Sequence, residues 1–421
     1  MLVSAVLLVA AACTSHSPQG NAGPPPTVAK AIKLVNAEKV SCPAAITSTC
    51  LTVGNISTIS GPVPGLFEGG EVGANAYFSY LDSTQGGIDG RKVSLLSDDD
   101  QFNGQTNEAD TQQLISKVLA FVGSFSLQDA DGGTILAQHP TVPNVSMSLS
   151  PTTIALPNTV MPQPTSDGWA EGPLLYFAKK YPQAVKHVGI LVAQEAAAEY
   201  AATNLEAGMV HEGYKIVYSQ LYGPLDTNFT PEVLAMKSAG VQFVDLTETD
   251  ATNAEDILAE MYQQGFHPEV IESAGPLYVD DFTQKAGGPQ VTDGVYLDQE
   301  DALYLGADAK SVPEVNTMLS WIQKVQPNFT TDLFTLYGWC AAMLFTEALE
   351  HSGSNPDSAS VLAALKKIHS FDAGGLMAPD NPGSRQPPSC WLLARVVNGV
   401  YVRIPPSPKS SFICDAGYYH R

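Results

Sequence analysis

Hydroxyl and amide groups follow the ends of three short apolar runs in the first half of the chain. Such runs read as strands, and open α/β sheets bind ligands at the carboxyl ends of their strands. Serine hydroxyls and backbone N–H groups there are hydrogen-bond donors that suit a polar or anionic ligand. The alternative for each serine is a helix cap or a turn. The candidates are Ser60, Ser124, Phe125, Ser126, Ser148, Leu149 and Ser150.

The second half of the chain offers acids and aromatic side chains at comparable positions. Glu195 and Tyr200 follow the apolar run His187–Ala193, and Thr247 and Glu248 follow the run Val241–Leu246. Either glutamate suits a ligand amine. Two aromatic candidates complete the set, with the alternative that a lone aromatic belongs to the core: Phe67 and Tyr278.

Motifs of enzymes and metal sites do not occur in the sequence. There is no G-x-S-x-G, H-E-x-x-H, P-loop, G-x-G-x-x-G or C-x-x-C pattern, and the eight histidines are scattered. The acids Asp98–Asp100 end a predicted strand, but lack the ligand alternation of a Ca²⁺ loop. We therefore expect no enzyme activity, no cofactor and no metal.

The elements that position these residues alternate between short strands and helices, which predicts parallel sheets covered on both faces. The pattern pauses at Met161–Ser166 and then begins again, which predicts two similar lobes. Asn398-Gly399 predicts a hairpin turn between the last strands. The predicted strands are Leu51–Ser57, Lys92–Leu96, Ala120–Phe125, Asn144–Ser148, His187–Ala193, Lys215–Leu221, Val241–Leu246, Glu269–Glu272, Leu392–Val397 and Val400–Ile404.

The length of 421 residues is more than one core usually serves, so two α/β domains are expected. We expect lobe 1 over residues 50–165 and 294–374, and lobe 2 over residues 166–293 and 375–421. Gly294–Asp298 is interpreted as the segment that crosses back. Hinges are expected near Pro164–Asp167, Ala274–Asp280 and Gly374–Ala378.

The N-terminal segment reads as an export signal. Residues 1–13 form a short apolar run that ends in small residues and Cys13, which resembles a lipobox with Cys13 as the lipidated residue. An ordinary cleaved signal is the alternative. Residues 14–45, which begin rich in Ser, Gly and Pro, are expected to form a flexible tether.

Export permits disulfides among the remaining cysteines. Sequence proximity favours Cys42–Cys50 and Cys390–Cys414, with Cys340 as a buried thiol, although four cysteines allow three pairings.

The net charge of the chain is −22, so nucleic acid and anionic lipid surfaces would repel the protein. We expect neither as a partner, and membrane contact only through the lipid anchor.

Several motifs in order resemble the type I periplasmic-binding-protein family, most closely its branched-chain amino-acid branch of ABC-transporter receptors. The resemblance runs from about Leu51 to Gly375. It rests on Ser57–Pro62, Gly73-Ala74, Gly86–Lys92, Asp98–Asp100, Gly123–Ser126 and Tyr337-Gly338.

The resemblance implies two Rossmann-like lobes joined by a multi-strand hinge. It also implies a monomer on the outer face of the cytoplasmic membrane that delivers an amino acid or similar compound to a permease. The two serine-rich loops would hold the ligand carboxylate. The sequence departs from the family at Gly275, where an ammonium-binding acid is expected, and at Leu127, where a serine is expected. An aromatic acid, an amide, a polyol or a larger amino-acid derivative therefore stays open as ligand, and a sensor role stays open beside transport.

Overall fold

The protein was analysed as a computed structural model, which describes residues 40–305, 308–405 and 411–421. The expected lipobox at 1–13 and the tether up to residue 39 lie outside the described residues. Residues 40–45 contain no helix or strand. Among the helices described, none combines the length and the apolar character that a membrane span requires.

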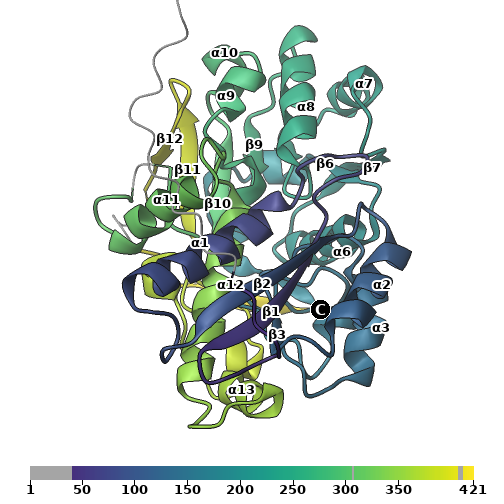
Figure 1. Ribbon diagram of the computed structural model, residues 1–421. Coiled ribbons are helices and arrows are strands. Elements are labelled where there is room, and N and C mark those ends of the chain that lie inside the picture. The colour runs from purple at the N-terminus through teal and green to yellow at the C-terminus, as the bar shows by residue number, and fades with distance from the viewer. Residues whose placement is uncertain (1–39, 306–307, 406–410) are drawn as a thin grey trace, which may run out of the picture. The chain divides into compact units, whose positions relative to one another are not determined.

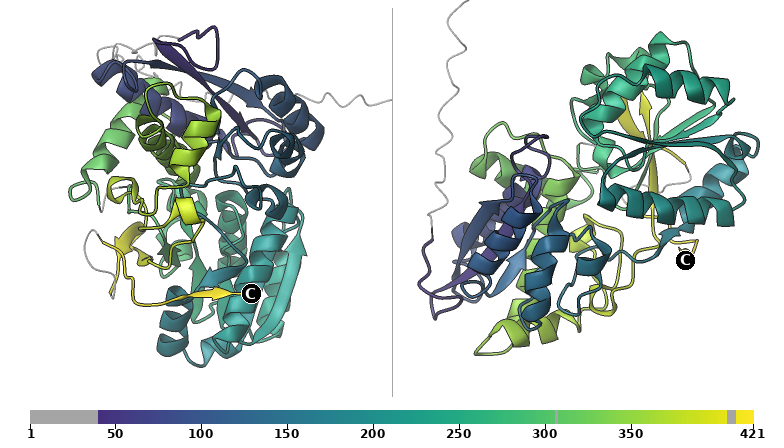
Figure 2. Two further views of the ribbon diagram at one scale, coloured as in Figure 1. Left: turned by 90° about the horizontal axis from the view of Figure 1, so that it is seen from below. Right: turned by 90° about the vertical axis from the view of Figure 1, so that its right-hand side faces the viewer.

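The first lobe is built on a parallel sheet of four strands in the order β2-β1-β3-β4. Neighbouring residues of a strand face opposite sides. Val53 of β1 accordingly packs in one core cluster with residues of α1 and α12, whereas Ile56 packs in another with residues of α2 and α3. Figures 1 and 2 show these helices around the sheet. The elements are β1 (Cys50–Ser57), α1 (Glu68–Thr84), β2 (Lys92–Asp99), α2 (Gly104–Leu114), β3 (Ala120–Val122), α3 (Asp129–Gln138), β4 (Asn144–Val145), α4 (Pro151–Ile154), α11 (Pro313–Val325), α12 (Leu333–Glu350) and α13 (Ser358–Leu365).

The second lobe is built on a sheet of seven strands in the order β12-β11-β10-β9-β8-β6-β7. β6 to β10 run parallel, and the β11–β12 hairpin joins antiparallel. Helices cover both faces, as the right-hand view of Figure 2 shows. The elements are α5 (Glu171–Lys180), β6 (Val188–Ala193), α6 (Ala196–His211), β7 (Ile216–Tyr222), α7 (Thr230–Ser238), β8 (Phe243–Asp245), α8 (Ala251–Gln263), β9 (Val270–Ser273), α9 (Phe282–Lys285), α10 (Pro289–Thr292), β10 (Tyr296–Gln299), β11 (Leu392–Val397) and β12 (Val400–Arg403). A further pair of strands, β5 (Gly168–Ala170) and β13 (Tyr418–His420), is antiparallel.

The α/β fold class with parallel sheets in two lobes is confirmed, but one segment lies elsewhere than expected. Gly294–Asp298 was interpreted as the crossing to the first lobe, whereas Tyr296 and Leu297 pair with β9 in the seven-stranded sheet. The strand pairs with β9 on one side and with β11 on the other, and the chain crosses after Gln299. Ala274–Asp280, expected at a hinge, lies within the second lobe between β9 and α9.

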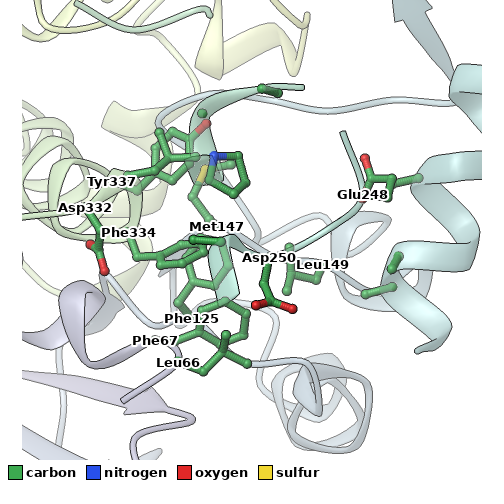
Figure 3. A pocket seen from close by; sticks show the side chains of 18 of the residues that line it. Leu66, Phe67, Phe125, Met147, Leu149, Glu248, Asp250, Asp332, Phe334 and Tyr337 are labelled. Atoms are coloured by element: carbon green, nitrogen blue, oxygen red, sulfur yellow. The ribbon is translucent and has the colours of Figure 1, made fainter. Parts of the chain in front are cut away.

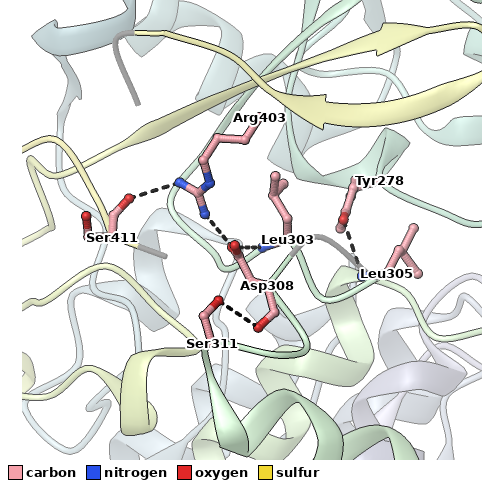
Figure 4. A network of polar contacts seen from close by, with 7 residues as sticks. All are labelled: Tyr278, Leu303, Leu305, Asp308, Ser311, Arg403 and Ser411. Atoms are coloured by element: carbon pink, nitrogen blue, oxygen red, sulfur yellow. Dashed lines mark hydrogen bonds and ion pairs between the residues drawn. The ribbon is translucent and has the colours of Figure 1, made fainter. Parts of the chain in front are cut away.

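Covalent and ionic links fix the peripheral segments. The structure contains the disulfides Cys42–Cys50 and Cys390–Cys414, and Cys340 is a buried free thiol. Arg403 of β12 donates to the Asp308 carboxylate, which also accepts from Leu303 N at 2.9 Å (Figure 4). The two side chains are only 10% and 4% exposed, so the pair anchors the segment after β10 to the hairpin.

Candidate functional site

A cavity of about 840 Å³ is lined by residues from both lobes. The first lobe contributes the loops after β1, β3 and β4 and the start of α12. The second lobe contributes the loops after β6, β8, β9 and β10. Most of these loops lie at the carboxyl ends of parallel strands, where the backbone groups and side chains of several strands converge. The volume falls in the range of about 300–1,000 Å³ that is usual for small-molecule sites.

Four aromatic side chains of the first lobe form one wall of this cavity, and we call them the aromatic cluster: Phe67, Phe125, Phe334 and Tyr337. The ring centroid of Phe125 lies 4.5 Å from that of Phe67, 4.8 Å from Phe334 and 6.1 Å from Tyr337. Figure 3 shows the three phenylalanines gathered beside Leu66, with Glu248 on the other side. The cluster is a surface for an apolar or aromatic ligand group.

The position of Phe334 and Tyr337 follows from how α12 begins and packs. The Asp332 carboxylate caps the helix by accepting a hydrogen bond from Thr335 N at 2.8 Å. Thr335 Oγ1 in turn accepts a hydrogen bond from Asp332 N at 3.3 Å. α12 crosses α1 so closely that a Cβ at Gly338 would lie 2.1 Å from Gly70 O. Only glycine fits this crossing, which brings the first turn of α12 against the loops after β1 and β3.

Acids dominate the polar lining of the cavity. The one basic side chain among the described lining residues is Lys285, and its Nζ lies 3.0 Å from Asp281 Oδ2. The carboxyl groups belong to Glu195, Glu248, Asp250, Glu255, Asp281, Asp298, Glu300, Asp301 and Asp332. The cavity therefore offers a ligand many acidic groups and no unpaired basic side chain among the described lining residues, which favours cations and hydrogen-bond donors over anions.

Burial raises the pKa of several of these acids, because the charged form loses its hydration. Burial, followed by the charge of Asp245, raises the pKa of Glu248 to about 8. Burial raises the pKa of Asp301 to about 8, and that of Glu300 well above its ordinary value. At neutral pH the carboxyls of Glu248 and Asp301 are therefore mostly protonated, and a bound cation beside them would favour their charged form.

Two buried residues of the cavity lining carry polar atoms without hydrogen-bond partners. Gln299 is 3% exposed and Asp301 2% exposed. Neither polar atom of the Gln299 side chain nor Asp301 Oδ1 has a hydrogen-bond partner. Buried polar groups are normally satisfied, so unpartnered ones in a cavity wall are candidates for ligand contacts.

The serine-rich loops use their polar groups within the first lobe. Ser124 Oγ accepts from Ile56 N at 3.0 Å, and Ser126 Oγ donates to buried Asp100 and accepts from Gln128 N at 2.9 Å. Ser124, Ser126 and Ser148 border a separate cavity of about 40 Å³ behind the wall. Of the serine candidates, Ser148 alone also lines the large cavity.

The structure brings together part of the residue set expected from the sequence. The candidates that line the cavity are Phe67, Phe125, Ser148, Leu149, Glu195, Tyr200, Thr247 and Glu248. Those outside its lining are Ser60, Ser124, Ser126, Ser150 and Tyr278. Ser60 bonds the Asp99 carboxylate, Ser150 caps α4, and Tyr278 is 1% exposed among Tyr304 and Tyr401.

Sequence reasoning did not name several lining residues as ligand contacts: Leu66, Met147, Gln299, Glu300, Asp301, Phe334 and Tyr337. Gln299 ends β10, Glu300 and Asp301 follow it, and the three residues would have been candidates had that strand been placed in the second sheet. Phe334 lies in an apolar helical run that gives no sign of which residues face a cavity.

Outside the cavity, one group among the described residues has donor atoms close enough to hold a metal ion: Glu171, His211 and Glu212. His211 is exposed, with Nε2 at 4.0 Å from Glu171 Oε1 and 3.8 Å from Glu212 Oε1. Exposed groups of this kind are common without a metal, and no function is assigned to it.

Two α/β lobes whose strand ends line one shared cavity define a two-lobed ligand-binding protein. The chain belongs to the periplasmic binding protein family, because the sequence model of that family matches residues 51–400. The resemblance seen in the sequence is thereby confirmed. Proteins of this family bind small ligands for ABC transporters outside the cytoplasm, and they are binding proteins rather than enzymes.

Solved structures share the fold at low sequence identity. The solute-binding protein of an ABC transporter from R. palustris, in complex with 4-hydroxybenzoate, is 20% identical with a TM-score of 0.70 over 87% of this chain and 97% of that chain. A fatty acid ABC transporter substrate-binding protein from Thermomonospora curvata is 15% identical, with a TM-score of 0.72 over 86% and 92%. A branched-chain amino acid transporter substrate-binding protein from Streptococcus pneumoniae, in complex with isoleucine, is 16% identical, with a TM-score of 0.67 over 85% and 100%. No curated protein matches in sequence.

Proposed function

We propose that this chain is the receptor of an ABC importer and encloses a small molecule with an aromatic or branched apolar body. The observation that carries the proposal is the aromatic cluster in the wall of the 840 Å³ cavity. Isoleucine and 4-hydroxybenzoate, held by two of the related structures, both combine an apolar body with polar groups. An amino-acid-like compound, expected from the sequence, belongs to the same class.

In the proposed mechanism the ligand bridges the lobes and shifts an equilibrium between open and closed arrangements. The segments that cross between the sheets, after β4, after β10 and after α13, act as the hinge. The closed form docks on a permease, and ATP hydrolysis elsewhere in the transporter supplies the energy. The receptor itself needs no cofactor for this task and works as a monomer.

Thermal-shift measurements with a ligand panel test the proposal, because a ligand that binds only the folded state raises the melting temperature. The panel contains branched and aromatic amino acids, the corresponding amines and amides, aromatic acids and polyols. We expect compounds with an apolar body to raise it, and Phe334→Ala to weaken their binding about 10- to 100-fold through lost apolar contact. Tyr262→Ala, which removes an exposed aromatic outside the cavity, is the control. A response to polyols alone, or full affinity in Phe334→Ala, would contradict the proposal.

We further propose that Cys13 carries the lipid that holds the receptor at the outer face of the cytoplasmic membrane, with the segment ahead of Cys42 as tether, because the disulfide of Cys42 with Cys50 ties the residues that follow to β1. Metabolic labelling with palmitate tests this. Label is expected on the wild type and absent from Cys13→Ser, and label retained in that variant would exclude Cys13 as the acceptor.

A further inference from the structure

Two backbone amides of the loop after β4, which the family resemblance led us to expect at a ligand carboxylate, are occupied by a carboxylate of the protein itself. Leu149 N donates to Asp129 Oδ2 at 2.8 Å, and Ser150 N donates to Asp129 Oδ1 at 3.0 Å. Asp129 begins α3, and Thr153 Oγ1 donates to its carbonyl oxygen at 2.9 Å. The loop after β4 is thus closed around an internal anion.

Four amides of the other first-lobe loops are also engaged. Phe125 N donates to Ser57 Oγ at 3.1 Å, and Ser124 N donates to Ser146 Oγ at 3.0 Å. Ile59 N and Ser60 N both donate to Asp99 Oδ1, at 3.0 and 3.1 Å. A ligand carboxylate at any of these four amides would displace an existing bond, and three of the four bonds are buried or partly buried.

The charge of the cavity opposes a carboxylate as well. Lys285 is the one basic side chain of the described lining, and it is already paired with Asp281. Like charges within a few ångströms of a partly buried site repel strongly. A ligand amine meets the reverse situation, because a bound cation favours the charged form of the acids beside it.

Gln299 and Asp301 provide the most specific receptors for such an amine. Gln299 is the last residue of β10, and Asp301 lies two residues after it. Both side chains are almost fully buried in the cavity wall. Gln299 Oε1 and Asp301 Oδ1 are acceptors without a partner. Gln299 and Asp301 line the same cavity as the aromatic cluster.

We propose that the cargo is a primary amine with an aromatic or branched apolar body and without a carboxylate. The amine is received by Gln299 and Asp301, and the body packs on the aromatic cluster. Asp129 is a specificity-determining residue, because its carboxylate fills the position that a ligand carboxylate would take. This inference rests on the proposed function and names its ligand class.

Isothermal titration of the wild-type protein with matched probes tests the inference. Phenethylamine, phenylalanine and 3-phenylpropionate share one aromatic body and differ in their charged groups, and isoamylamine and leucine form a branched pair. We expect at least one amine of these pairs to bind ten times more tightly than its amino acid, and 3-phenylpropionate to give no binding heat. An amino acid or 3-phenylpropionate that binds as tightly as the amine, or amines that do not bind, would overturn the inference.

Variants distinguish a failure of the amine inference from a failure of the proposed function. Gln299→Leu should weaken amine binding at least tenfold, whereas Gln284→Leu, exposed on α9 and outside the cavity, should not. Asp129→Ala, which frees the amides of Leu149 and Ser150, should gain affinity for phenylalanine relative to phenethylamine. If carboxylates bind the wild type and Phe334→Ala weakens them, the amine inference alone is wrong. If Phe334→Ala changes no affinity, the proposed function is wrong too.

Discussion

The Ser126 hydroxyl shows how a residue that suits ligand binding can serve the fold instead. Its Oγ donates to Asp100 and accepts from Thr58 Oγ1 and Asn107 Nδ2, both at 3.3 Å, and Asp100 is fully buried. The sequence places Ser126 after a strand in the expected loop. The sequence does not reveal that the buried carboxylate of Asp100, which directly follows β2, accepts a hydrogen bond from this hydroxyl, because the contact joins residues far apart in the chain.

Ser126→Ala is therefore expected to destabilise the protein and to leave ligand affinity unchanged. Removing one partner from a buried network costs about 1–3 kcal/mol of the free energy of unfolding. Urea unfolding measures this, with exposed Ser83→Ala on α1 as the control. An unchanged free energy of unfolding together with weakened ligand binding would return Ser126 to the binding site.

The single residue Asp301 is expected to make the free energy of unfolding depend on pH. Its pKa rises from an ordinary 3.8 to about 8 in the folded protein because of burial. Between these values the folded state holds a proton that the unfolded state releases, so the free energy of unfolding falls as pH rises through this window. Asp301→Asn cannot titrate and should reduce the fall between pH 5 and pH 8. Urea unfolding at both pH values measures the fall, and an equal fall in the free energy of unfolding for the variant and the wild type would contradict this.

At the scale of elements, local sequence predicted most of the architecture. The hairpin with Asn398-Gly399 forms as expected, since its turn chemistry is local. β10 was misplaced, because pairing with β9 is a tertiary choice that apolar character alone does not encode. The same limit applies to α12, whose apolar sequence predicts a helix but does not specify that Phe334 faces the loops after β1 and β3.

The buried ion pair that joins two elements yields a prediction of its own. Arg403→Met leaves the Asp308 carboxylate buried without its partner, which is expected to cost about 3–5 kcal/mol of the free energy of unfolding. Lys285→Met breaks an exposed pair and should cost less than about 1 kcal/mol. Urea unfolding compares the two, and equal small losses would show that the Arg403 contact does not hold the segment after β10.

At the scale of the whole molecule, the two lobes and their shared cavity followed from the repeated strand–helix pattern and the family motifs. The character of the cavity did not. Acids are abundant throughout a chain with 43 of them, so the sequence cannot indicate which gather at one wall. The occupation of the loop amides by Asp129 depends on how α3 packs against α4, which only the folded structure shows.

Hydrogen exchange on the folded protein, with and without the panel compound that gives the largest thermal shift, tests the central claim most directly. If one ligand contacts both lobes in the cavity, amide exchange should slow together in residues 63–67 and 329–337 of the first lobe and in residues 247–250 and 299–301 of the second. Slowed exchange confined to one lobe, or located away from these segments, would contradict the account.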